Sequence, residues 1–286
     1  MVFSNDQMGV NIMMKRALSI AGSAARGGAG IQADLKTFQE LEVFGTTAVT
    51  AIVARNPRTG EGVFPQHIDA IEAQVYTALQ DTGADAIKTG MLFTEEIITK
   101  TAEWIEVSKV EHIIVDPVMI GKVGSVLLKE NAISSMKKKL LPLATIITPN
   151  MPEAAELLGW ETIETTEQLK QAAKELHALG SQYVLVKGGR LEGPALDVLY
   201  DGEQFYMLEA PRIETIHTNG AGCTYSAAIT AQLAKGASVP EAVAFAKNFI
   251  TAAIRHAFGF EQGVGPTYHA AYRKFGETEV KNWIEQ

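Results

Sequence analysis

The sequence predicts an α/β protein whose sheet is mainly parallel and covered by helices on both faces. The first observation is that short apolar runs, typical of buried strands, alternate at least six times with segments of helical spacing. The second is that glycine-rich turns follow several of these runs and lead into the next helix. The third is the composition: 47% of the 286 residues are hydrophobic and 20% are charged, as in a globular protein with a substantial core.

The predicted strands are apolar, rich in β-branched residues, and bounded by glycine, proline or asparagine. They cover 17–21, 45–54, 86–92, 113–119, 145–150 and 183–189, followed by a hairpin of 195–200 and 204–208 around the turn Asp201-Gly202. The predicted helices have apolar residues at helical spacing, with start or stop signals at their ends. They cover 31–38, 68–82, 95–107, 130–141, 167–179 and 239–257, one more begins at Pro152, and a charged helix is expected at the chain end.

The chain has no linker rich in proline, glycine or serine, so we predict a single domain over residues 16–286. Residues 1–15 are mostly polar and lack the features of a signal peptide, which predicts a loose N-terminal extension. Apolar runs are too short for a transmembrane helix, so no membrane association is expected. A single cysteine fits a reducing cytosol and predicts a cytoplasmic protein, and the net charge of −8 argues against nucleic-acid binding.

The run from His217 to Ser226 is the first candidate site. Gly220-Ala221-Gly222 precedes a small-residue helical run that stops at Gly236. The first N–H groups of a helix lack partners and carry partial positive charge, and glycine lets the backbone approach an oxyanion. We therefore predict an anion cradle at 220–223, with the sulfur of Cys223 at its mouth and a lowered thiol pKa. Seen alone, such a turn is usually a plain connection, and a lone cysteine is usually packed in a core.

Two further features should meet the cradle at one edge of the sheet, because ligands bind beyond the carboxyl ends of parallel strands. Asp116 lies near the carboxyl end of one predicted strand, Asn150 ends the next, and Glu153 follows shortly after; their oxygens suit Mg²⁺. Lys187-Gly188-Gly189 offers a cation and bare backbone to nucleotide phosphates. A cradle, a magnesium site and a lysine are what phosphoryl transfer needs. A Walker A motif is absent, so the sequence favours a kinase of another type.

A glycine-rich loop over 22–30 joins the first predicted strand to the first helix and suggests contact with a ligand. It does not read G-x-G-x-x-G, so a dinucleotide-binding dehydrogenase is not favoured. Asp34 in the helix and Arg55 at the exit of the second strand could be solvated surface charges or part of the site.

Six motifs stand in register along residues 17–269. They read Gly27-Gly28-Ala29-Gly30-Ile31-Gln32-Ala33-Asp34-Leu35-Lys36, Lys88-Thr89-Gly90-Met91-Leu92, Asp116-Pro117-Val118-Met119, Thr148-Pro149-Asn150-xx-Glu153, Lys187-Gly188-Gly189 and Gly220-Ala221-Gly222-Cys223-Thr224. With this series the chain resembles the ribokinase-like superfamily and, within it, the kinases of hydroxymethylpyrimidine and pyridoxal. The resemblance implies a three-layer α/β/α sandwich with a mainly parallel central sheet, ATP and Mg²⁺ as cofactors, a small heteroaromatic substrate, and a homodimer.

The resemblance also implies roles for the matching residues. Cys223 stands where the superfamily usually has an aspartate base and would accept the proton of the substrate hydroxymethyl group. Gly220, Ala221 and Gly222 would hold the transferring phosphate through their N–H groups, and Asp116 and Glu153 would serve the metal. The implied nucleotide contacts are Asn150, Lys187, Gly189, Thr218 and Gly222. The implied contacts to the substrate ring, in an apolar slot, are Gly22, Ala29, Asp34, Val53, Arg55, Met91 and Val118.

Four residues depart from the family pattern, mostly on the substrate side. Ala24 replaces an aspartate of the first loop, and Arg55 replaces the glutamine that reads the pyrimidine. Gly121 replaces a second cysteine carried by the dual-cysteine pyridoxal kinases, and Asn219 replaces a histidine.

We therefore expect an ATP- and Mg²⁺-dependent kinase acting on pyridoxal, pyridoxine or pyridoxamine. The alternative is hydroxymethylpyrimidine or its monophosphate, the substrates of thiamine synthesis, and Arg55 could favour a substrate that is already phosphorylated. A vitamer-binding protein with weakened catalysis, and a sugar or nucleoside kinase of the same fold, are further alternatives.

Overall fold

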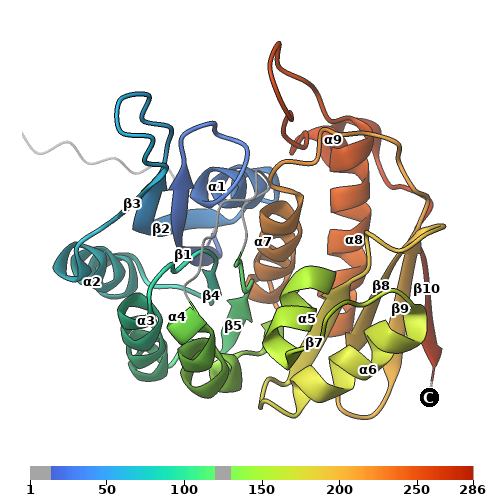
Figure 1. Ribbon diagram of the computed structural model, residues 1–286, viewed down its shortest axis with the longest axis horizontal. Helices are drawn as coiled ribbons and strands as arrows, with labels where there is room; N and C mark the ends of the chain where they lie inside the picture. Colours follow the sequence, from blue (N-terminus) through green and yellow to red (C-terminus); the bar gives the residue numbers. More distant parts are fainter. Residues whose placement is uncertain (1–13, 120–129, 286) are drawn as a thin grey trace, which may run out of the picture.

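One sheet runs through the protein. The computed structural model describes residues 14–119 and 130–285, and within them ten strands pair in the order β10-β9-β8-β7-β6-β5-β4-β1-β2-β3 (Figure 1). The strands are β1 (Arg16–Ala24), β2 (Phe44–Val53), β3 (Val63–Pro65), β4 (Ala86–Thr89), β5 (His112–Val115), β6 (Ile146–Ile147), β7 (Tyr183–Lys187), β8 (Ala195–Tyr200), β9 (Phe205–Ala210) and β10 (Lys281–Glu285). The pairs from β2 to β7 are parallel, whereas β3 and β8 to β10 join antiparallel. The predicted mainly parallel sheet is confirmed.

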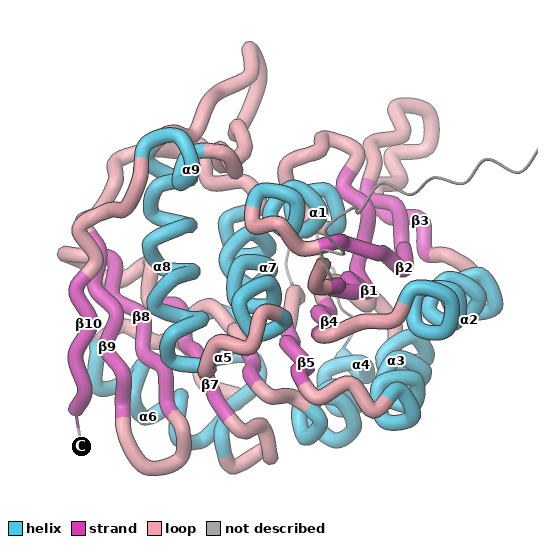
Figure 2. Tube along the Cα trace, turned by 180° about the vertical axis from the view of Figure 1, so that it is seen from behind, coloured by secondary structure: helices cyan, strands magenta, loops and turns pink. Residues whose placement is uncertain are grey.

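Helices cover both faces of this sheet, which gives the predicted three layers (Figures 1 and 2). One layer contains α2 (Ile68–Thr77), α3 (Glu95–Ser108), α4 (Glu130–Ser135), α5 (Met151–Leu158) and α6 (Thr166–His177). The other contains α1 (Ile31–Glu40), α7 (Ala221–Ala234), α8 (Val239–Arg255) and the short α9 (Ala271–Phe275). Since every described strand belongs to the one sheet, the architecture supports our proposal of a single domain.

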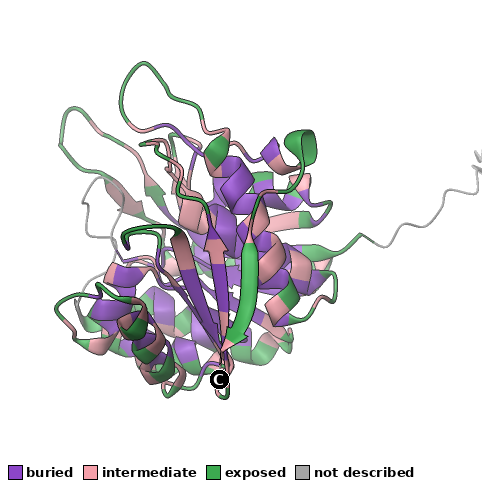
Figure 3. Ribbon diagram, turned by 90° about the vertical axis from the view of Figure 1, so that its right-hand side faces the viewer, coloured by how far each residue is buried: buried purple, intermediate pink, exposed green. Residues whose placement is uncertain are grey.

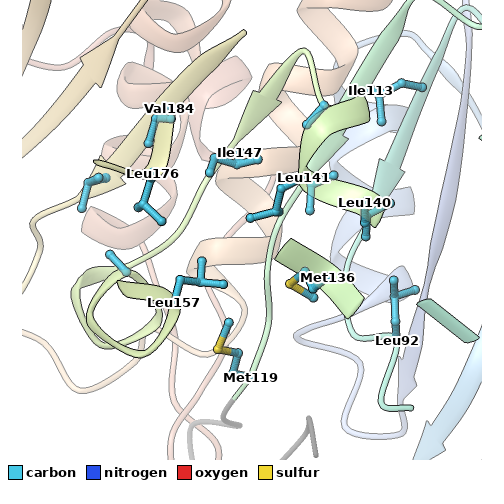
Figure 4. Packing of buried hydrophobic residues seen from close by; sticks show 14 of the residues in the cluster. Leu92, Ile113, Met119, Met136, Leu140, Leu141, Ile147, Leu157, Leu176 and Val184 are labelled. Carbon is cyan, nitrogen blue, oxygen red and sulfur yellow. The ribbon is translucent and has the colours of Figure 1, made fainter. Parts of the chain in front are cut away.

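The strands divide their side chains between two hydrophobic clusters. Ile113 and Val115 of β5 pack in the cluster under α2 to α6, whereas Ile114 packs under α7 and α8. Val184 and Leu185 of β7 are separated in the same way. Successive strand residues point to opposite faces, so a strand that is buried on both sides must be apolar throughout. Figure 4 shows the first cluster from close by, with residues from strands, helices and turns in contact.

Local signals explain where several helices begin. The Thr94 hydroxyl accepts a hydrogen bond from the Ile97 N–H (3.2 Å) at the start of α3. Helices α6 and α8 begin at capping boxes formed by Thr165 with Gln168 and by Ser238 with Glu241. Within two predicted helices the backbone changes its hydrogen bonding, because π-helical turns follow α2 at Ala78–Thr82 and α4 at Met136–Leu140.

The chain end differs from the prediction. The charged helix expected there is wrong: residues 281–285 form β10, which pairs antiparallel with β9, and the last helix is α9. The unpaired backbone groups of β9 provide a partner that no local pattern reveals. This edge strand is largely exposed, as Figure 3 shows beside the C-terminus. Strand β3, a short partner of β2, was also not predicted.

The parallel strands place their carboxyl ends along one edge of the sheet. The loop after Ala24, the turn at Gly90, and the residues Asp116, Asn150 and Gly188 all follow such ends. The segment 121–124, which contains Gly121, lies outside the described residues. No described helix combines the length and the apolarity that crossing a bilayer requires.

Candidate active site

The cradle has the backbone geometry that the sequence predicted. Gly220 precedes α7 with φ of 80°, and a side-chain carbon there would lie 1.7 Å from the Gly28 carbonyl oxygen, so only glycine fits. The Ala221 N–H donates to the Thr218 carbonyl (3.2 Å), so this amide already has an acceptor within the protein. The N–H groups of Gly222 and Cys223 belong to the first turn of α7 and have no acceptor within the helix. These two amides are therefore the ones best suited to a phosphate.

The loop before α1 closes over the cradle. The Gly30 N–H donates to the Cys223 sulfur at 3.4 Å. The Cα of Ala29 would lie 3.0 Å from a side-chain carbon on Gly220. Segments almost two hundred residues apart in sequence thus meet at the thiol, a contact that the two glycine-rich turns did not by themselves predict.

Asp116 is the electrostatic centre of the site. It follows β5 and is 1% exposed. One carboxylate oxygen accepts from Lys187 Nζ (3.1 Å) and from the Thr148 hydroxyl (3.1 Å), and the other accepts from the Ser226 hydroxyl on α7 (3.2 Å). Despite burial, which opposes ionisation, Lys187 and these donors hold the pKa of the Asp116 carboxyl below its ordinary value. Asp116 is consequently a fixed anion.

Lys187 stands between Asp116 and the cradle. A side-chain carbon on Gly222 would lie 3.3 Å from Lys187 Nζ and 4.0 Å from Asp116 Oδ2. Burial lowers the pKa of Lys187, but the carboxylates of Asp116 and Glu153 outweigh it, and the net direction is upward. The ammonium is therefore a permanent positive charge beside the amide of Gly222. Gly189, in contrast, is exposed two residues further on, and its carbonyl accepts from Arg212 Nη1 (2.9 Å).

Asn150 and Glu153 form a capping box at the start of α5. The Glu153 carboxylate accepts from the Asn150 N–H (2.8 Å), and the Asn150 side-chain oxygen accepts from the Glu153 N–H (3.0 Å). Burial, with a contribution from the Asp116 charge, raises the pKa of the Glu153 carboxyl to about 7. Both side chains that were predicted to serve nucleotide and metal thus have a local structural role as well.

The two acidic side chains fit a divalent cation. The described residues contain no group of three or more His, Cys, Asp or Glu that could hold a metal. Mg²⁺ nevertheless usually takes only one or two carboxylates and keeps several waters. Burial raises the pKa of Glu153, the charge of Lys187 lowers it, and the charge of Asp116 raises it, so the three charged groups lie near one another. Asp116 and Glu153 would hold such an ion, which would supply neutralisation of phosphate charge.

Three of the predicted ring contacts pack into one small apolar cluster. Met91 and Ala51 are its buried members, and Val53, Val63 and Val118 pack against them. A side-chain carbon on Gly22 would lie 2.6 Å from the Met91 methyl group, so any larger residue at this position would displace the Met91 side chain. The structure therefore brings together Gly22, Val53, Met91 and Val118, from four segments of the chain.

Asp34 belongs to a buried network that the sequence reasoning did not anticipate. Its Oδ2 accepts from the Ser19 hydroxyl (2.6 Å) and from Lys88 Nζ (3.1 Å), and both Asp34 and Lys88 are fully buried. The other oxygen, Oδ1, is buried without a hydrogen-bond partner. Lys88 stood within a quoted motif, yet no role was predicted for it. The sequence could have indicated this network, because a lysine within a predicted buried strand requires a partner of opposite charge.

The predicted lowering of the Cys223 pKa is wrong. Burial raises the pKa of the thiol to about 11. The Lys88 charge and the Gly30 N–H lower it, but the carboxylates of Asp34 and Asp116 raise it again. The prediction considered only the start of α7, whereas desolvation and two nearby anions outweigh that helix terminus.

Three of the four departures from the family pattern lie in the described part of the chain, on segments that border the site. Arg55 is exposed beyond β2, and no described contact brings it to the cluster of Met91. Ala24 ends β1, where its N–H donates to the Gln32 side chain (2.8 Å). The Asn219 N–H donates to the Gly265 carbonyl (3.1 Å), which ties the cradle to the 265–267 segment. Gly121 lies outside the described residues.

Comparison with known proteins points to vitamin kinases. A family model described as phosphomethylpyrimidine kinase matches residues 25–268. The chain is 50% identical to a pyridoxine kinase of Bacillus subtilis, with 91% of this chain and 97% of that protein covered. It is 43% identical to a hydroxymethylpyrimidine/phosphomethylpyrimidine kinase of the same bacterium, with 91% and 96% covered. The solved pyridoxal kinase of Staphylococcus aureus, in complex with AMP-PCP and pyridoxal, superposes with a TM-score of 0.88 at 42% identity, covering 95% of this chain and 100% of that one.

Proposed function

The chain belongs to the phosphomethylpyrimidine kinase family, and from this premise we propose that it phosphorylates the hydroxymethyl group of pyridoxal, pyridoxine or pyridoxamine. Membership of the family makes the protein an ATP-dependent phosphotransferase with a ribokinase-like fold. The choice of a vitamin B6 substrate depends on one observation, the higher identity to a pyridoxine kinase (50%) than to a pyrimidine kinase (43%). The replacement of the pyrimidine-reading glutamine by Arg55 supports the same choice.

The proposed reaction proceeds by positioning and charge stabilisation. We place the ring against the apolar cluster of Met91. Asp34 Oδ1, which is buried without a hydrogen-bond partner, is the polar group proposed to serve the ring. The N–H groups of Gly222 and Cys223 face the transferring phosphate, and Lys187 adds positive charge beside Gly222. Asn150, Gly189 and Thr218 complete the nucleotide side, while Asp116 and Glu153 serve Mg²⁺.

Cys223 is the proposed acceptor of the hydroxyl proton. With a pKa of about 11, the free protein holds the thiolate in only about one molecule in 10⁴ at pH 7. The sulfur nevertheless stands at the cradle, held by the Gly30 N–H. Proton transfer to a thiolate is therefore compatible with the geometry, and its rate should depend on pH.

Phosphorylation of hydroxymethylpyrimidine or its monophosphate is the second candidate function. It is favoured by the family model itself and by relatives at 43% identity. A positive charge at Arg55 would suit a substrate that already carries a phosphate. We further propose a cytoplasmic protein, because a single cysteine fits a reducing compartment.

An ADP-release assay across both substrate groups tests the proposal. Purified protein is supplied with ATP, MgCl₂ and, in turn, pyridoxal, pyridoxine, pyridoxamine, hydroxymethylpyrimidine, its monophosphate, ribose and adenosine. We expect the highest kcat/KM with a B6 vitamer. Higher turnover of the pyrimidines would reverse the order of the two candidates. Vitamer binding in calorimetry without ADP release would support a binding protein instead, and turnover of ribose or adenosine would support a sugar or nucleoside kinase.

A further inference from the structure

A third buried ion pair lies on the strand next to Lys187. Asp197 in β8 and Lys247 in α8 are 3% and 4% exposed, and Lys247 Nζ donates to Asp197 Oδ2 at 2.6 Å. The same ammonium donates to the Ala195 carbonyl (2.9 Å). Burying two charges costs desolvation energy that their attraction often fails to recover. A gain in stability therefore does not explain why these two charges are buried here.

The second carboxylate oxygen of Asp197 faces the turn that follows β7. Asp197 Oδ1 accepts a hydrogen bond from the Gly188 N–H at 2.9 Å. Lys187 and Asp197 are opposite each other in the β7–β8 pair. A side-chain carbon on Gly188 would lie 2.1 Å from the Leu196 carbonyl oxygen, so the loop lies directly against β8. The carboxylate thus fixes the peptide that immediately follows Lys187.

The Lys187 side chain, one residue before the Gly188 N–H, reaches into the candidate site. Its Nζ is 3.1 Å from Asp116 Oδ1 and close to Gly222 in the cradle. Burial, and to a lesser extent the charge of Asp197, raises the pKa of the buried Tyr225 phenol on α7, two residues after Cys223. The Asp197 carboxylate thus joins the turn after β7 to α8 by two hydrogen bonds.

We propose that Asp197 is a positioning residue for the nucleotide, acting through the Gly188 N–H on Lys187, and that Lys247 holds its carboxylate in place. The inference rests on the proposed function, because it assigns the phosphates of ATP to Lys187. It predicts an effect on the nucleotide side of the site, and the ring pocket around Met91 lies on other strands.

Two double variants isolate the hydrogen bond. Lys247→Met with Asp197→Asn removes both buried charges but keeps an oxygen for the Gly188 N–H. Lys247→Met with Asp197→Ala removes the acceptor as well. We expect the Asn variant to keep a KM for ATP close to that of the wild type. The Ala variant should raise this KM about 10-fold, since a lost hydrogen bond to a buried amide costs on the order of 1.4 kcal/mol. The KM for the ring substrate should stay unchanged in both.

Leu199→Ala provides the control for plain destabilisation. Leu199 is fully buried in the same strand, so its truncation should lower Tm without changing the KM for ATP. Equal ATP KM values in the two double variants would overturn the proposal, as would a parallel rise of both KM values in the Ala variant. AMP-PCP titration of the same proteins gives the nucleotide affinity without turnover. A wild type that binds AMP-PCP but phosphorylates no vitamer would therefore contradict the proposed function alone.

Discussion

At the scale of single residues, the environment of Cys223 decides its chemistry. A thiol at a helix start is expected to ionise readily, but here burial and two carboxylates raise its pKa to about 11. Lys88 is the cation that opposes them, and it is itself neutralised by Asp34 at 3.1 Å. The residue that would act as base is thus held mostly in its protonated form.

This pKa predicts a pH-dependent rate. If the Cys223 thiolate accepts the substrate proton, log(kcat/KM) for the best vitamer should rise by about one per pH unit from pH 7 to 9.5, because the reactive form increases tenfold per unit below the pKa. Cys223→Ala should lose ~100-fold or more in kcat and the slope with it. Cys223→Asp, which supplies a carboxylate already ionised at pH 7, should give a flat profile. A flat profile in the wild type, or near-normal turnover in Cys223→Ala, would remove Cys223 from the role of base.

At the scale of elements, the start of α5 combines a cap with a candidate ligand. The Glu153 carboxylate closes a capping box with Asn150, and the same carboxylate is predicted to serve the metal. Its folded-state pKa of about 7 lies above the ordinary value of 4.5. A raised carboxyl pKa stabilises the folded protein at pH values below the ordinary pKa, and this contribution is lost as the pH rises through the folded value.

Thermal unfolding across pH tests this linkage. Without divalent cations, Tm of the wild type should fall between pH 5 and pH 8. Glu153→Gln keeps an oxygen for the Asn150 N–H but cannot ionise, so its Tm should change less over the same range. MgCl₂ at pH 8 should then raise Tm of the wild type more than that of the Gln variant. Parallel pH profiles for the two proteins would show that Glu153 does not titrate in this range.

At the scale of the whole molecule, the sheet positions every part of the site. Strands β1, β4, β5, β6 and β7 are neighbours, and the residues that follow them converge although they are far apart in sequence. The packed clusters on both faces of the sheet hold these strands in place, and with them the residues that we propose contact the nucleotide and the ring. Helix α7 begins at the cradle and packs in the hydrophobic cluster that it shares with α8, so it connects the candidate site to the core.

The whole-molecule proposal that the protein is a homodimer is open to a direct measurement. The exposed side chains of Leu35, Phe44 and Phe258 line one surface hollow, and apolar groups that gather on a surface are typical of contact sites. Size-exclusion chromatography with light scattering should give twice the chain mass of 30.9 kDa. The mass of one chain at every protein concentration from about 1 to about 100 µM would contradict the dimer.

The sequence by itself determined the α/β class, most strands and helices, and the glycine-rich turns, because these depend on patterns within a few residues. It also located the carboxyl-end residues Asp116, Asn150 and Lys187, since in parallel sheets chain order implies spatial order. Only the tertiary structure decided the pairing of Lys88 with Asp34, the anchoring of Gly188 by Asp197 and the end strand β10 on β9. It also reversed the predicted pKa shift of Cys223, because desolvation and Coulomb interactions depend on distances between segments that a local pattern does not contain.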